Sequence, residues 1–192
     1  MKSTTAVIGF TLVASCLASA HAQGHADADS LVLERTQCFG TCPAYRVRIA
    51  RDGKLLFQSR NPGDSTIAVD SVGAGTFAEL MGRANRAGIF SLPERIMSDR
   101  SICVDYATDH PTVTLTVFKG DEKDSVEDYL GCYAAVDHSL NDTLRRLRNF
   151  QIAVDSALRT ARWVRPARIR RWPPDRRAAR SHHIPIDNAF SQ

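Results

Sequence analysis

The stretch YRVRIARDGKLLF, residues 45–57, decides the fold of this chain. Apolar residues alternate with arginines in its first half, which is the period of a β-strand that buries one face. The apolar face carries Tyr45, Val47 and Ile49, and the other carries Arg46, Arg48 and Ala50. Asp52-Gly53 supplies a tight turn, and Leu55 and Phe57 resume the alternation. Residues 44–60 are therefore predicted to form a β-hairpin.

A second hairpin is predicted further along the chain. Val113, Leu115 and Val117 alternate with threonines, and a polar turn at residues 119–122 leads into a return strand near Asp124–Tyr129. A first strand is expected at residues 31–35. Residues 65–71 are compatible either with a further strand or with irregular structure.

Two helices are predicted from apolar residues that recur at steps of three and four. The first begins near Thr76 and ends near Gly88, with its stripe at Phe77, Leu80, Met81, Ala84 and Ala87. The second covers roughly residues 139–161, with its stripe at Leu140, Leu144, Leu147, Val154 and Leu158. Its Arg145, Arg146 and Arg148 side is expected to face solvent. Residues 93–109, with weak periodicity, are expected to form a loop that contains Cys103.

The predicted order of elements is β-β-β-α-β-β-α. Strands grouped in hairpins and followed by helices favour the α+β class over a parallel βαβ fold. We therefore expect an antiparallel sheet of about five strands in two hairpins, with two helices packed on one face.

The N-terminus is typical of a secretory signal peptide. Lys2 precedes an apolar stretch over residues 6–18, and small residues at Ala20 and Ala22 favour cleavage before Gln23. The competing interpretation is a lipoprotein that is anchored through Cys16, because residues 13–16 resemble a lipoprotein box. No later segment has the length and apolarity of a membrane helix. Both interpretations place the protein outside the cytoplasm, in the periplasm or secreted.

The net charge of +4 is distributed unevenly. Residues 163–192 hold seven arginines and two aspartates, a net charge of +5, so the rest of the chain sums to −1. We expect a signal peptide at 1–22, a flexible lead-in at 23–30, one domain at 31–162 and a disordered Arg/Pro-rich tail at 163–192. The tail could bind an anionic envelope surface. Nucleic acid is the less available partner for an exported protein.

Four cysteines follow the signal peptide, and export favours their pairing. Four cysteines allow three pairings. Gly40 permits a tight Cys38–Cys42 loop. Cys103 and Cys132 flank the open ends of the second hairpin, which favours their pairing. The alternatives are a redox-active Cys38/Cys42 pair, although the usual spacing is C-x-x-C before a helix, and an all-thiolate zinc site, which needs two closely spaced pairs.

The run Cys38-Phe39-Gly40-Thr41-Cys42-Pro43-Ala44-Tyr45 resembles the C-F-G-x-C-P-x-Y signature of a bacterial family, domain of unknown function 6438. Asp109 and Pro111 fit a T-D-x-P element of the same family, and the resemblance extends over roughly residues 31–164. It implies an exported envelope domain, and it supplies no catalytic residues. Cys103, Cys132 and the arginine-rich tail are not assigned to the family pattern.

No assembled catalytic motif is visible in the sequence. Asp109 and His110, with Asp105 nearby, could in principle support acid–base chemistry, but a histidine before a proline is typical of a turn. There is no nucleophile elbow, zinc-protease helix or phosphate loop. We therefore expect a disulfide-stabilised binding or interaction module without cofactor or metal, whose envelope ligand or protein partner is unknown. The competing hypothesis is a periplasmic thiol–disulfide or other envelope enzyme that uses Cys38 and Cys42.

Overall fold

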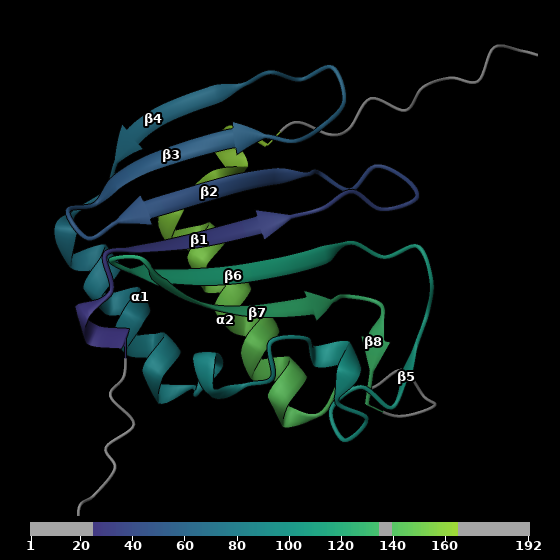
Figure 1. The fold of residues 1–192 in the computed structure, drawn as a ribbon. Helices are drawn as coiled ribbons and strands as arrows, with labels where there is room; N and C mark the ends of the chain where they lie inside the picture. The colour runs from purple at the N-terminus through teal and green to yellow at the C-terminus, as the bar shows by residue number, and fades with distance from the viewer. Residues whose placement is uncertain (1–24, 135–139, 165–192) are drawn as a thin grey trace, which may run out of the picture.

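The computed structural model describes residues 25–134 and 140–164. Six strands form one antiparallel sheet in the order β4-β3-β2-β1-β6-β7 (Figure 1). They are β1 (Ser30–Arg35), β2 (Tyr45–Ala50), β3 (Lys54–Ser59), β4 (Ile67–Ser71), β6 (Thr112–Lys119) and β7 (Glu122–Tyr129). The predicted α+β class with two hairpins is confirmed. The additional strand is β4, in the segment whose structure the sequence pattern left open.

Strand β1 joins the two hairpins into one sheet. It pairs antiparallel with β2 on one side, where Leu33 lies opposite Val47, and with β6 on the other, where Leu33 lies opposite Leu115. Because side chains alternate along a strand, this register places the apolar residues of all three strands on the same face. Tyr45, Val47 and Ile49 are buried on that face, as predicted.

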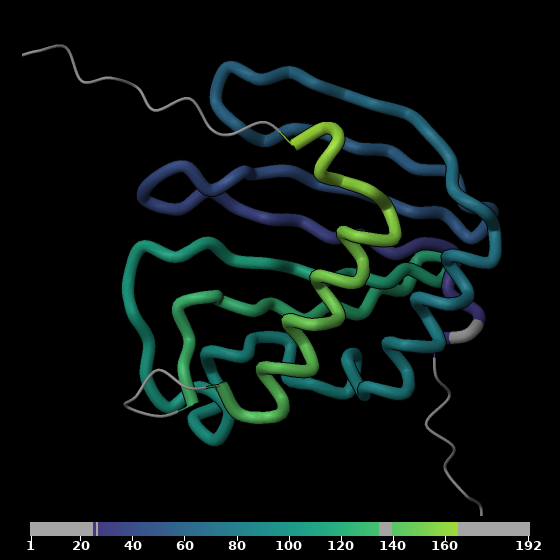
Figure 2. The backbone as a smooth tube through the Cα atoms, turned by 180° about the vertical axis from the view of Figure 1, so that it is seen from behind, coloured from purple at the N-terminus to yellow at the C-terminus, as the bar shows by residue number. Residues whose placement is uncertain are grey.

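Two helices cover this apolar face. Figure 2, seen from the helix side, shows α2 (Asp142–Leu158) running diagonally across the strands with α1 (Ala74–Arg86) beside it. Helix α2 begins at Asn141, whose side chain accepts a hydrogen bond from the Leu144 backbone N–H, and it ends at Arg159, whose φ is 52°. It is therefore shorter at both ends than predicted. The helix residues that are buried against the sheet include Phe77, Leu80, Leu144, Leu147, Val154 and Leu158.

The segment predicted as a loop at residues 93–109 contains short elements that contribute to the core. A 3-10 turn, η3 (Ile96–Ser98), buries Ile96 completely. Strand β5 (Asp105–Tyr106) pairs with β8 (Cys132–Tyr133) in a separate two-stranded sheet. The remaining short elements are the 3-10 turns η1 (His25–Asp27), η2 (Ile89–Ser91) and η4 (Thr160–Arg162).

The packed region extends slightly beyond the predicted bounds of 31–162. Ala28, which we assigned to the lead-in, is fully buried. Trp163 and Val164, which we assigned to the tail, pack against the core. The predictions for the signal peptide, Cys16 and the rest of the tail lie outside the described residues. Among the described residues, no helix has the length and apolarity needed to span a membrane.

Gly53 closes the first hairpin and joins it to β4. Its φ of 85° lies in the region that favours glycine, and its carbonyl accepts a hydrogen bond of 2.9 Å from the Val72 backbone N–H. A Cβ atom at this position would clash with the Val72 carbonyl oxygen. The turn therefore requires glycine both for its conformation and for space.

Gly53→Ala is expected to lower the free energy of unfolding by about 3 kcal/mol, because backbone strain and a steric clash act together. Gly63→Ala is the matched control, since Gly63 has a φ of 74° but no atom within 4 Å of the added Cβ. It should lose only about 1 kcal/mol. Urea denaturation of both variants measures the difference, and equal losses would mean that the approach of Val72 is unimportant.

Candidate functional site

A pocket of about 390 Å³ lies at the end of the sheet where β1 leaves and β2 begins. Its walls come from the β1–β2 loop, from the residues that flank the second hairpin and from the end of α2. Most of its lining is apolar, and its polar side chains gather at one place. The lining residues are Arg35, Cys42, Pro43, Tyr45, Pro111, Leu130, Asp155, Thr160, Ala161 and Val164.

The two parts of the sequence that carry the family resemblance meet at this end of the molecule. The backbone N–H of Phe39 donates a hydrogen bond of 3.2 Å to the carbonyl of Asp109. Asp109 itself has a φ of 68°, and its carboxylate accepts a hydrogen bond from the Thr108 hydroxyl. Pro111 then enters the wall of the pocket. The contact explains how segments far apart in the sequence shape one surface.

Not every residue of the motif reaches the pocket. Cys42, Pro43 and Tyr45 line it, whereas Phe39 lies outside it with 90% of its side chain exposed. Cys38 is bonded to Cys42 with a Cα–Cα separation of 5.5 Å, and Gly40 forms the bend between them with a φ of 151°. The disulfide therefore holds one rim of the pocket.

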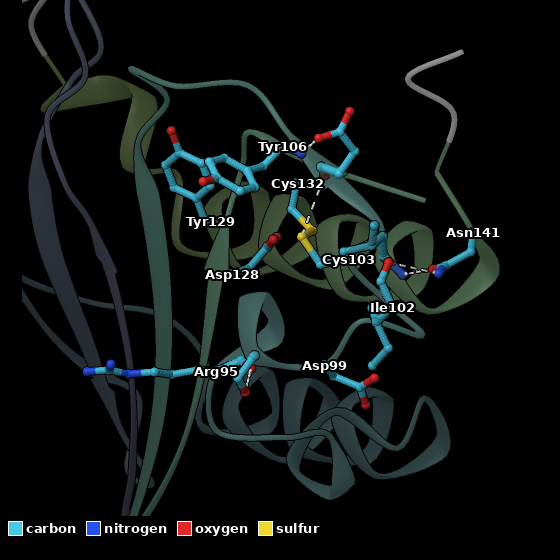
Figure 3. The surroundings of a disulfide bond; sticks show 12 residues. Arg95, Asp99, Ile102, Cys103, Tyr106, Asp128, Tyr129, Cys132 and Asn141 are labelled. Atoms are coloured by element: carbon cyan, nitrogen blue, oxygen red, sulfur yellow. Dashed lines mark hydrogen bonds between the residues drawn. A yellow bond between two sulfur atoms is a disulfide. The ribbon is translucent and has the colours of Figure 1, made fainter. Parts of the chain in front are cut away.

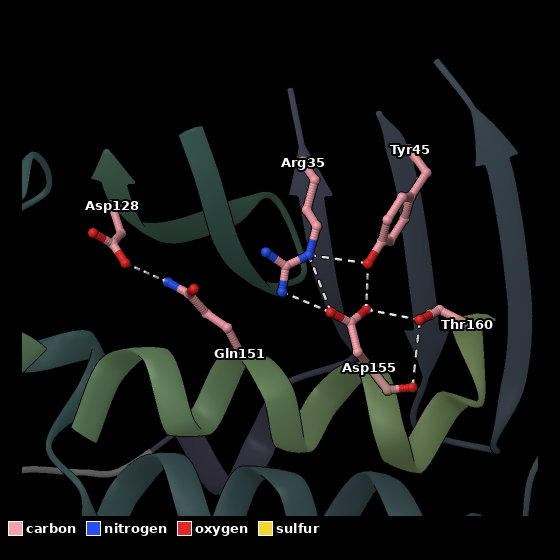
Figure 4. Close-up of polar contacts among 6 residues, drawn as sticks. All are labelled: Arg35, Tyr45, Asp128, Gln151, Asp155 and Thr160. Carbon is pink, nitrogen blue, oxygen red and sulfur yellow. Dashed lines mark hydrogen bonds and ion pairs between the residues drawn. The ribbon is translucent and has the colours of Figure 1, made fainter. Parts of the chain in front are cut away.

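The polar floor of the pocket is a network centred on the carboxylate of Asp155 (Figure 4). Arg35, at the end of β1, donates to Oδ2 from Nε at 3.0 Å and from Nη2 at 2.6 Å. The Tyr45 hydroxyl donates to Oδ1 at 2.6 Å and accepts a hydrogen bond from Arg35 Nε. The Thr160 hydroxyl donates to Oδ1 at 2.9 Å. Both carboxylate oxygens thus accept two hydrogen bonds each, which compensates for their removal from water.

Burial and charge both act on the groups of this network. Burial raises the pKa of Tyr45, and the neighbouring Asp155 carboxylate raises it further. Burial by itself lowers the pKa of Arg35, but the Asp155 charge and the hydrogen bonds to Asp155 and Tyr45 outweigh that effect and leave the pKa raised. The phenol is therefore held protonated and the guanidinium charged across the physiological range.

A second polar contact joins α2 to the other side of the sheet. Asp128 of β7 is fully buried. Its carboxylate accepts a hydrogen bond of 2.9 Å from the Gln151 side chain and forms an ion pair with Arg148 at 3.3 Å. The prediction that Arg148 faces solvent is wrong, because only 17% of its side chain is exposed. Arg145 and Arg146, by contrast, are exposed as predicted.

The second disulfide lies beside this contact and near the start of α2 (Figure 3). Cys103 and Cys132 are both buried, and their bond is the pairing that the hairpin geometry favours. Arg148 donates to the Cys132 carbonyl at 3.0 Å, and the Asn141 side chain donates to the Ile102 carbonyl at 3.1 Å. The disulfide region and the N-terminal half of α2 therefore fix each other. Both disulfides together leave none of these four sulfurs for a zinc site.

The residues considered for acid–base chemistry, Asp105, Asp109 and His110, are all exposed. His110 is exposed and lies edge-on to Tyr129, with 6.5 Å between ring centroids. Its backbone N–H, rather than its ring, contacts the Tyr129 hydroxyl, and Asp105 is also exposed. Within residues 25–134 and 140–164, no group of three or more His, Cys, Asp or Glu side chains is placed to hold a metal ion.

Sequence reasoning did not identify Arg35, Asp155 or Thr160. A signal was present beside the apolar stripe of the second helix, where Gln151 is buried among leucines and valines and Asp155 is half-buried next to Val154. A polar residue on the buried face of a helix needs a partner. The partner itself could not be identified, because Arg35 is 120 residues away in the chain.

Comparison with known families gives a match over most of the described chain. Residues 29–151 match the model of a family described as Domain of unknown function (DUF6438). The match ends inside α2, earlier than the expected limit at residue 164, so that Arg35 and Tyr45 lie within it and Asp155 and Thr160 lie beyond it. No curated protein matches the chain.

Asp155→Asn is expected to destabilise the protein by about 3 kcal/mol, because it leaves the largely buried Arg35 charge without a compensating carboxylate. Glu79→Gln is the control, since Glu79 pairs with Arg83 on an exposed face of α1 and should cost less than about 0.5 kcal/mol. Chemical denaturation compares the two. The double variant Arg35→Met, Asp155→Leu should recover part of the loss, and a failure to recover any would show that the charge is not the cause.

The raised pKa of Tyr45 predicts a loss of stability at alkaline pH. An ordinary tyrosine titrates near pH 10, so above about pH 10 the unfolded chain loses a proton that folded Tyr45 retains, and the free energy of unfolding falls as the pH rises. Tyr45→Phe should remove this part of the pH dependence. Denaturation between pH 8 and 11 and tyrosinate absorbance measure it, and identical pH profiles for the two proteins would contradict the assignment.

Proposed function

The chain belongs to the DUF6438 family, and on that premise we propose that it is an exported, non-catalytic binding module that holds a small, mostly apolar molecule in the pocket beside Tyr45. The main support for this proposal is the pocket itself. Its volume of about 390 Å³ falls within the range of roughly 300–1,000 Å³ that small-molecule sites occupy. Export is supported by the signal-peptide pattern and by two disulfides, which persist in oxidising compartments.

The wall of the pocket specifies the apolar part of the ligand. Pro43, Pro111, Leu130 and Val164 present carbon surfaces to the pocket from four separate places in the chain. Removing an apolar ligand surface from water yields about 25 cal/mol per Å². An apolar group that fills the pocket therefore gains binding energy without needing an ionic partner.

The floor of the pocket specifies the polar part. Arg35 uses Nε and Nη2 to bind Asp155 and Tyr45, and Nη1 takes no part in the network (Figure 4). Because Asp155 balances the charge of Arg35, the remaining N–H groups favour a neutral acceptor such as a carbonyl, ether or hydroxyl oxygen over a strong anion. We therefore propose an apolar ligand that carries one such oxygen.

The same network argues against catalysis at this site. The Asp155 carboxylate already accepts four hydrogen bonds, so it lacks a free lone pair for a substrate proton. The Tyr45 phenol is held protonated by its raised pKa. The thiol–disulfide hypothesis has less support, because Cys42 precedes Pro43 and strand β2, whereas a helix N-terminus commonly stabilises a reactive thiolate. The role of the tail at an anionic surface remains a prediction.

Ala161→Trp is expected to abolish binding of the neutral apolar fluorophore N-phenyl-1-naphthylamine, because the added indole fills the pocket that Ala161 lines. The wild-type protein should bind the probe saturably, with a rise in fluorescence. Ala78→Trp is the matched control: it places the same side chain at an exposed position in a different hollow beside α1, and it should leave binding unchanged.

Circular dichroism and thermal melting establish that both variants remain folded. Absence of saturable binding to the wild type would refute a ligand pocket for apolar molecules. An equal loss of binding in both variants would place the probe elsewhere on the protein.

A further inference from the structure

The two edge strands of the sheet, β4 and β7, differ in how far the rest of the chain covers them. On the β7 edge, the Glu127 backbone N–H donates a hydrogen bond of 2.7 Å to the Glu94 carbonyl, and Arg95 forms a bridge to the same strand. The segment that leads into η3 thus covers part of that edge. On the opposite edge, β4 lies outermost, with no strand beyond it in the described part of the chain (Figure 1).

Strand β4 directs unused backbone groups outward. It pairs with β3 at both ends, where Thr66 accepts from the Ser59 N–H and Val72 donates to the Gly53 carbonyl. Hydrogen bonds in an antiparallel ladder alternate along a strand. The register that places Ile67 opposite Gln58 and Val69 opposite Leu56 therefore points the N–H and C=O groups of Ile67 and Val69 away from β3.

The side chains of the same two residues are apolar and exposed. Ile67 is 65% exposed and Val69 is 79% exposed, and both lie on the face of the sheet opposite the helices. Monomeric proteins usually protect an edge strand with lysine, proline or a bulge. The sequence of β4, Ile67–Ser71, contains neither lysine nor proline. An unprotected edge with exposed apolar residues is a surface for strand addition.

The only charge on β4 is neutralised within the chain. Asp70 points to the helix side of the sheet and forms an ion pair with Arg162, whose guanidinium lies 3.9 Å above the ring centroid of Trp163. Two copies of β4 can therefore approach without unbalanced repulsion between their carboxylates.

We propose that β4 pairs antiparallel with β4 of a second copy of this chain, so that two six-stranded sheets join into one. The register that aligns all five residues of both strands places Val69 on the two-fold axis, and the Ser71 N–H, which donates to Asp70 Oδ1 at 2.7 Å in one copy, has to exchange that bond for Ile67 of the other. Each Val69 then exchanges both backbone hydrogen bonds with its counterpart, and Ile67 lies opposite Ser71. The second copy is the occupant that the edge favours, because this register is self-complementary: it places Asp70 opposite Ala68 rather than opposite a like charge, and it gathers the exposed Ile67 and Val69 side chains of both copies on one face.

Light scattering coupled to size-exclusion chromatography tests the proposal on the full exported chain. The wild type should have twice the mass of one chain at high concentration and should dissociate on dilution. Val69→Lys should remain monomeric, because two lysines would meet on the axis. Ile152→Lys is the control, since Ile152 is 60% exposed on α2, away from the edge, and this variant should dimerise like the wild type.

A crosslinking experiment distinguishes loss of pairing from loss of folding. Val69→Cys should form a covalent dimer joined at position 69 under mild oxidation, whereas Ile152→Cys should not. A wild-type protein that is monomeric at every concentration would overturn the proposal. So would a dimer that persists in Val69→Lys, or a Val69→Cys variant that crosslinks no faster than Ile152→Cys.

Discussion

One half-buried carboxylate organises the end of the fold that holds the pocket. Asp155 accepts four hydrogen bonds, from Arg35, Tyr45 and Thr160, which belong to β1, β2 and η4. Removing a charged pair from water is costly, and the cost is offset only when its partners are all in place. The positions of two strands and of the chain after α2 are therefore interdependent. Because the Asp155 network tolerates little displacement of these segments, the walls of the pocket that they form are held in place.

The second polar contact of α2 repeats this arrangement with the charges exchanged. At Asp155 the helix supplies the carboxylate and the sheet supplies the arginine, whereas at Asp128 the sheet supplies the carboxylate and Arg148 of the helix supplies the charge. Residues 148, 151 and 155 lie along one stripe of α2, at helical spacing. A helix that packs only through leucines and valines can shift along the sheet with a modest loss of stability. Here a shift of one turn would separate both ion pairs. The two contacts thus specify the register of α2 on the sheet.

The two disulfides serve different parts of this arrangement. Cys103–Cys132 is buried beside the start of α2, where it supports the Asp128 contact through the Cys132 carbonyl. Cys38–Cys42 is partly exposed and holds the loop that forms the rim of the pocket. Because that loop also contacts Asp109, the rim is tied to the second hairpin. The apolar pocket therefore results from packing between segments that are distant in the chain. The exposed edge at β4 lies apart from this pocket.

The sequence by itself determined the hairpins, the α+β class and most of the buried face, because alternation along residues 45–57 and 113–117 and the helical stripes are local patterns. It also indicated the family and favoured the disulfide pairing. It did not decide whether residues 65–71 form a strand, and it assigned Arg148 to solvent, because both depend on neighbours that are distant in the chain. The polar floor of the pocket was likewise decided only by the tertiary structure. Tyr45 belongs to the sequence motif, but Arg35 and Asp155 look unremarkable in sequence, and only the packing of α2 across the sheet brings the three side chains within hydrogen-bonding distance.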